Sequence, residues 1–113
     1  MEILEREVMP AKQHWSLRGL ARYLQSDCKT IKKYDALTQQ VLPAYRMFAL
    51  NQQAKGYSPY RAWVLIQVIK LSRLIAEDMA GTRFDFIVRN AVVKNAQHLT
   101  PEAFRVYTNY QEN

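Results

Sequence analysis

Two short amphipathic segments joined by a polar turn constrain the fold of this chain more than any other feature. The first, residues 16–24, has apolar residues at i, i+3, i+4 and i+7, a spacing that gathers them on one helical face. These residues are Leu17, Leu20, Ala21 and Leu24. The second, residues 28–34, has one apolar anchor, Ile31, among three lysines, a threonine and a tyrosine. A basic helix braced by an apolar one is typical of the helix-turn-helix that reads the DNA major groove.

The boundaries of the two segments carry helix-capping residues. Ser16 is a candidate N-cap for the first helix, and Asp27 or Ser26 for the second, because their side chains can accept hydrogen bonds from free backbone N–H groups. The pattern alone leaves another interpretation open, since helical hairpins also occur in folds that bind no nucleic acid.

The basic residues are concentrated in one part of the chain. Residues 12–61 contain nine lysines and arginines and only two acidic residues, a net charge of +7, whereas the whole chain of 113 residues carries +6. Such an uneven distribution favours a polyanionic partner, and double-stranded DNA is the partner that we predict. A basic but merely solvated surface is the alternative.

The segment after the two helices predicts a wing. Residues 44–50 alternate as in a strand, residues 51–56 form a polar turn ending in glycine, and residues 57–60 provide the returning strand. The predicted fold class is therefore mainly α with a small β-hairpin wing, a winged helix-turn-helix followed by C-terminal dimerisation helices. We expect an N-terminal arm over 1–14, the DNA-binding domain over 15–61 and a helical dimerisation region over 62–113.

The C-terminal region predicts three helices. The first begins near Pro59 to Arg61, is apolar over most of its circumference and ends before Gly81, and a second copy of the chain is the simplest cover for it. The second helix starts at Thr82, and the last has Thr100 as its cap and Pro101 at its first position. The residues expected in the homodimer interface are Trp63, Ile66, Ile69, Phe84, Ile87, Val88, Phe104 and Tyr107.

The DNA-binding residues predicted from these elements form two groups. The recognition helix would present Lys29, Thr30, Lys32, Lys33 and Tyr34 to the major groove. The first helix and the wing would hold phosphates through Arg18, Arg22, Arg46, Lys55, Tyr57, Tyr60 and Arg61.

Catalytic motifs are missing from the sequence. His14 and His98 stand alone, Cys28 is the only cysteine, and there is no glycine-rich phosphate loop. We therefore predict a cytoplasmic protein that is not an enzyme, with no cofactor, no metal site, no membrane association and no evident small-molecule effector. A redox role for Cys28 stays open.

Several motifs, in this order, resemble the DNA-binding domain of MerR-type transcription regulators. The similarity covers residues 16–24 as the first helix, residues 30–35 as the recognition-helix signature, Leu42-Pro43 as the step into the wing, and residues 56–60 as its end. The segment 30–43 is about two residues longer than is usual in the family, and Ser58 stands where the wing normally has an arginine.

The resemblance implies a homodimeric regulator that binds an inverted repeat. The lack of an effector domain favours a repressor, similar in size to the MerR-type repressors that accompany CRISPR-associated transposons. The rival hypothesis is a small helical interaction module, an adaptor or antitoxin-like protein, whose basic part binds an acidic protein.

Overall fold

A computed structural model describes residues 14–52, 55–78 and 84–112 of the chain. Its elements are α2 (Leu17–Leu24), α3 (Cys28–Val41), α4 (Pro43–Asn51), α5 (Pro59–Asp78), α6 (Phe84–Lys94), the short 3-10 helix η1 (Ala96–His98) and α7 (Pro101–Glu112). The predicted arm, with the exception of His14, and the predicted boundary at Gly81 and Thr82 lie outside the described residues.

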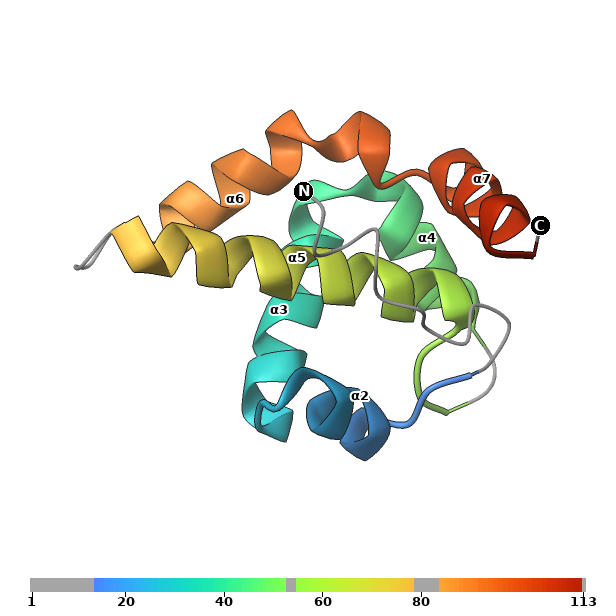
Figure 1. Ribbon diagram of the computed structural model, residues 1–113, viewed down its shortest axis with the longest axis horizontal. Coiled ribbons are helices and arrows are strands. Elements are labelled where there is room, and N and C mark those ends of the chain that lie inside the picture. The colour runs from blue at the N-terminus through green and yellow to red at the C-terminus, as the bar shows by residue number, and fades with distance from the viewer. Residues whose placement is uncertain (1–13, 53–54, 79–83, 113) are drawn as a thin grey trace.

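Helix α5 crosses the middle of the molecule, and the other helices pack on it from several sides (Figure 1). Helix α3 runs across α5, and α2 packs against α3 at the end opposite α4. Helix α6 returns along α5, and α7 covers the beginning of α5. The predicted start of α5 near Pro59 and the predicted start of α7 at Pro101 are both confirmed.

The predicted β-hairpin wing is wrong. Residues 43–51 form helix α4, and the only extended pairing among the residues described is a single antiparallel bridge between Trp15 and Tyr57. Pro43 stands at the first helical position, where its fixed φ angle favours a helix and its missing N–H is not needed. Tyr45 is fully buried, whereas Met47 is 57% exposed. Residues two apart lie on the same face of a strand but on different faces of a helix, so this difference fits the helix.

The loop between α4 and α5 packs against the segment that leads into α2. The two bridge hydrogen bonds join the Trp15 and Tyr57 backbones at 2.9 and 2.8 Å. Gly56 has a φ angle of +89°, and a Cβ atom at this position would lie 2.5 Å from the Trp15 carbonyl oxygen. Glycine is therefore required here by both the backbone conformation and the close approach.

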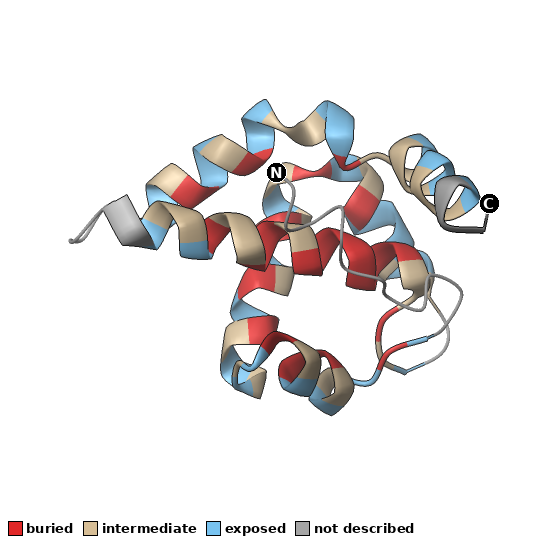
Figure 2. Ribbon diagram, in the orientation of Figure 1, coloured by how far each residue is buried: buried red, intermediate tan, exposed pale blue. Residues whose placement is uncertain are grey.

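The apolar circumference of α5 is covered by the chain itself. One hydrophobic core runs from Trp15 through Leu20 and Ile31 to Val92 and Leu99, so the predicted halves 15–61 and 62–113 share it. Figure 2 shows the buried residues concentrated along α5 and on the inner sides of its neighbours. A second copy is not needed to bury this helix.

This packing changes the set of residues available for dimerisation. Among the eight residues predicted for the interface, four are buried in the chain's own core: Trp63, Ile66, Ile69 and Val88. The other four are partly buried: Phe84, Ile87, Phe104 and Tyr107. Phe104 and Tyr107 pack against Trp63 in tilted arrangements, with ring centres 5.4 and 5.7 Å from it, so they too contribute to intramolecular packing.

Candidate nucleic-acid interface

The helix pair α2–α3 forms at the residues that the sequence indicates. The Ser16 hydroxyl accepts a hydrogen bond from the Gly19 N–H at 2.9 Å, and the Asp27 carboxylate accepts one from the Thr30 N–H at 2.8 Å. Both predicted N-caps are thus confirmed, with Asp27 in place of the alternative Ser26. The hydrogen bonds from Thr30 lower the pKa of Asp27. Gln25 adopts the left-handed conformation that reverses the chain between the helices.

The inner sides of these two helices are apolar and buried. Leu20, Ala21 and Leu24 of α2 are buried, and so is Ile31 of α3. Thr38 of α3 is also fully buried, and its hydroxyl donates to a carbonyl one turn earlier in the same helix, at 2.6 Å. The orientation of α3 is therefore fixed by its packing, which leaves its other side to solvent.

The solvent side of α3 carries the lysines. Its exposed residues recur at i, i+3, i+4, i+7 and i+11, which places them on one helical face. They are Lys29, Lys32, Lys33, Ala36 and Gln40, and we call this set the α3 face. On the neighbouring helix α2, Arg18 and Arg22 are exposed as well. Five of the predicted DNA-binding residues are thus basic, accessible and located on two adjacent helices.

Four other predicted contacts are buried and cannot reach a partner from these positions. They are Tyr34, Tyr57, Tyr60 and Arg61. The Tyr60 hydroxyl donates to the Leu99 carbonyl at 2.6 Å, which joins α5 to the start of α7. Burial raises the pKa of Tyr60 to about 12. These residues belong to the core, and we remove them from the candidate interface. Thr30 stays in it as a partly exposed residue.

The remaining predicted contacts lie outside the helix pair. Arg46 is exposed on α4, which begins after the last turn of α3, so about 20 Å of helix separates it from the start of α3. Lys55 is exposed in the loop beside Gly56, whose backbone abuts Trp15, just before α2. Lys55 therefore lies near the start of α2, whereas Arg46 lies on α4, which packs on α3.

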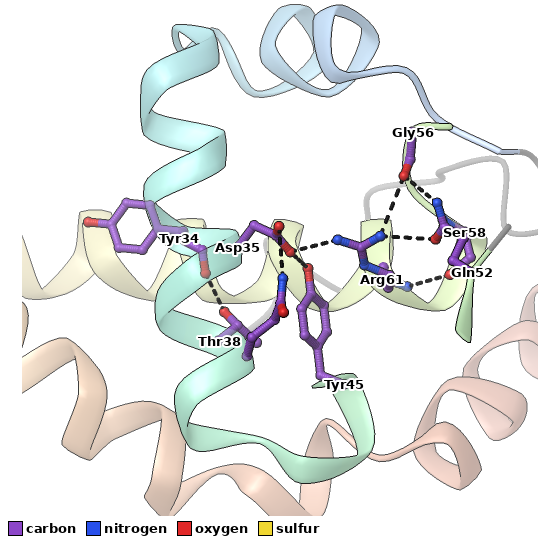
Figure 3. Close-up of polar contacts among 9 residues, drawn as sticks. Tyr34, Asp35, Thr38, Tyr45, Gln52, Gly56, Ser58 and Arg61 are labelled. Atoms are coloured by element: carbon purple, nitrogen blue, oxygen red, sulfur yellow. Dashed lines mark hydrogen bonds and ion pairs between the residues drawn. The ribbon is translucent and has the colours of Figure 1, made fainter. Parts of the chain in front are cut away.

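Arg61 is the centre of a buried polar cluster that joins three helices (Figure 3). Its guanidinium group forms an ion pair with Asp35 of α3 at 2.8 Å and donates to the side chain of Gln52 at 3.0 Å. The Tyr45 hydroxyl donates to the same Asp35 carboxylate. The guanidinium carbon lies 5.4 Å from the Tyr45 ring centre and 4.8 Å from that of Tyr57.

The cluster keeps its groups in defined protonation states. Burial alone would lower the pKa of Arg61, but the Asp35 carboxylate beside it raises the pKa. Burial, together with the Asp35 carboxylate, raises the pKa of Tyr45, so its hydroxyl stays protonated and donates. Arg61 therefore fastens α5 to α3 and does not serve as a DNA contact. Its position among apolar residues of the predicted helix was the sequence signal for burial.

Two contacts to the helix pair were not anticipated from the sequence. Asp85, in the first turn of α6, forms an ion pair with Lys33 at 3.0 Å, and the two side chains are 56% and 50% exposed. The hydrogen bond to Asp85 raises the pKa of Lys33. Arg73 of α5 donates to the carbonyl of Leu24, the last residue of α2, and so supports the turn before α3. Neither pairing has a local sequence signal, because the partners are far apart in the chain.

No family model, curated protein or solved structure matches this chain. The described residues contain no group of three His, Cys, Asp or Glu side chains that could hold a metal ion. None of the helices in that part of the chain is both long enough and apolar enough to cross a membrane.

Proposed function

We propose that this protein binds double-stranded DNA in a sequence-specific manner and regulates transcription, with α3 as its recognition helix. The observation that carries the proposal is the α3 face, on which Lys29, Lys32 and Lys33 are exposed while the opposite side of the helix is anchored in the core. An anchored helix with an accessible basic side is what a helix-turn-helix places in the major groove.

The division of roles follows from position and chemistry. Lys29 and Lys32 lie toward the N-terminal part of α3, the part that approaches base edges in helix-turn-helix complexes. Arg18 and Arg22 of α2, with Lys55 beside that helix, are suited to phosphates, which fix register without reading sequence. No wing is part of this proposal, because residues 43–51 form helix α4.

A homodimer that represses transcription from an inverted repeat remains part of the proposal. Two copies related by a twofold axis would place two α3 helices on two half-sites. Light scattering of the purified protein tests the dimer, for which a mass of twice 13.3 kDa is expected. A monomeric mass at DNA-binding concentrations would reduce the target to a single half-site.

Selection of bound duplexes from a random pool tests the function. We expect enrichment of one sequence, and a symmetric one if the protein binds as a dimer. Lys32→Ala should weaken binding to the selected duplex about tenfold, the size of a lost specific contact. Arg105→Ala, which removes an exposed positive charge from α7, is the matched control and should change affinity less than twofold.

Three outcomes would contradict the proposal. If no duplex is enriched, the proposed sequence-specific recognition of DNA is wrong. Equal losses in the Lys32 and Arg105 variants would indicate a general charge effect without a defined reading helix. Stable binding to an acidic protein, with no duplex preference, would favour the interaction-module alternative.

A further inference from the structure

The three lysines of the α3 face differ in their surroundings. No ion pair involves Lys29 or Lys32 in the described part of the chain, whereas Lys33 is bridged to Asp85 of α6 at 3.0 Å. Both partners of this bridge are about half exposed, so water and ions reach it. The bridge is therefore accessible to a competing anion, and it lies on the surface that we propose for DNA.

The position of Asp85 is imposed by the core. Val88, one helical turn later in α6, is fully buried, and so is Val92 after it, which fixes the orientation of the helix against α5 and α3. Asp85 thus stands over α3 whether or not Lys33 holds it. A carboxylate in the first turn of a helix also interacts favourably with the helix dipole.

We propose that Asp85 is an intramolecular competitor of DNA, a carboxylate that occupies on Lys33 the place of a DNA phosphate and thereby weakens the affinity of α3. This inference rests on the proposed function and concerns its regulation. A carboxylate and a phosphate are both oxygen anions that bind a lysine ammonium group through charge-assisted hydrogen bonds. DNA must break the ion pair between Lys33 and Asp85 before Lys33 can contribute to binding. Lys33 therefore adds little to the DNA affinity of the wild-type protein.

A double-mutant cycle of Asp85 and Lys33 tests this competition. Asp85→Asn removes the negative charge and keeps the shape of the side chain, so it should tighten DNA binding about twofold to fivefold, the range for an exposed ion pair. Lys33→Ala alone should change affinity less than Lys32→Ala does. In the Lys33→Ala background, Asp85→Asn should give no gain, because there is no lysine left to release.

The cycle requires affinities of four proteins for one duplex. Fluorescence anisotropy with the duplex recovered from the random pool gives the four values at one salt concentration. Glu102→Gln is the matched control, because Glu102 is an exposed acidic residue in the first turn of α7 and makes the same charge change away from α3. We expect this variant to bind like the wild type. Asp85→Asn and Glu102→Gln should lower the unfolding midpoint only slightly, because each removes a carboxylate from the first turn of a helix.

The outcomes separate this inference from the proposed function. A full-size gain from Asp85→Asn in the Lys33→Ala background, or an equal gain from Glu102→Gln, would show a general charge effect and overturn the competition. Unchanged affinity in Asp85→Asn would overturn it too. If Lys32→Ala weakens binding in the same experiment, the proposed function survives that result. If neither the wild type nor any variant binds a duplex, both fail together.

Discussion

The basic residues in the middle of segment 12–61 have surroundings opposite to those of Arg61 at its C-terminal end. Lys29 and Lys32 project from α3 into solvent, and α3 is held in place by the apolar residues on its other side. Arg61 is buried against Asp35, Gln52 and two tyrosine rings. Counted in the sequence, these three residues contribute equally to the positive charge of the segment. In the folded protein, only the lysines are available to a partner.

This difference shows what a charge count can establish. The net charge of a segment indicates an affinity for polyanions only to the extent that its charges are exposed. Asp35 and Arg61 neutralise each other inside the protein, and Asp85 opposes Lys33 from another helix. The exposed basic surface is therefore smaller than the sequence suggests, and on the helix pair α2–α3 it consists mainly of Lys29, Lys32 and the two arginines of α2.

Removing Arg61 should have the largest effect of the changes considered. Arg61→Ala leaves the Asp35 carboxylate without its buried partner, which should lower the free energy of unfolding by about 3 kcal/mol. Arg61→Lys keeps the charge but not the forked geometry and should lie between this variant and the wild type. Urea denaturation followed by circular dichroism measures both.

The same variant also tests whether the buried cluster around Arg61 is separate from the exposed α3 face. Under conditions in which it is folded, the Arg61→Ala variant should bind DNA with the wild-type affinity, because Arg61 does not reach the surface. A stability loss under 1 kcal/mol, or a specific loss of DNA affinity by the folded variant, would contradict the structural role of this residue.

Tyr60 gives a smaller, pH-dependent test of the interior. Its pKa is raised to about 12 in the folded protein, above the ordinary value of about 10, because burial disfavours the phenolate. The folded state therefore retains a proton that the unfolded state loses. The resulting stability is complete below pH 10 and is lost as the pH rises to 12.

The Tyr60→Phe variant isolates this contribution. Between pH 10 and 12, the wild type should lose about 2 kcal/mol more stability than the variant, and at pH 8 the variant should be weaker by about 1 kcal/mol for the lost bond to Leu99. Urea denaturation at a series of pH values measures the difference. Parallel pH curves for the two proteins would show that Tyr60 titrates alike in the folded and unfolded states.

The local parts of the fold could be predicted from the sequence. The caps at Ser16 and Asp27 and the start of α5 near Pro59 depend on interactions within a few residues. The strand prediction for residues 44–50 is wrong because a largely apolar run of that length fits a strand and a helix almost equally well. Pro43, directly before this run, favours a helix start and is the stronger signal.

The tertiary parts of the candidate site could not be predicted. Lys33 and Asp85 are adjacent only because α6 packs on α3. The burial of α5 likewise depends on how the other helices of the chain are arranged around it. The periodicity of α5 does not show whether its apolar residues are covered by these helices or by a second copy of the chain. The burial of Arg61 was easier to predict from the sequence. This residue directly precedes the buried run Ala62–Ile66, and a charged side chain in such surroundings usually has a buried partner.

A salt titration of DNA affinity tests the central claim most directly. The wild type and the Arg18→Ala/Arg22→Ala double variant are titrated with the selected duplex between about 50 and 200 mM salt. If both arginines bind phosphates, the logarithmic salt slope of the variant should be shallower by about 1.8, at 0.9 for each lost contact, with its unfolding midpoint unchanged. Identical slopes for the two proteins, or a wild-type affinity that does not change with salt, would contradict the assignment of the helix pair α2–α3 to DNA.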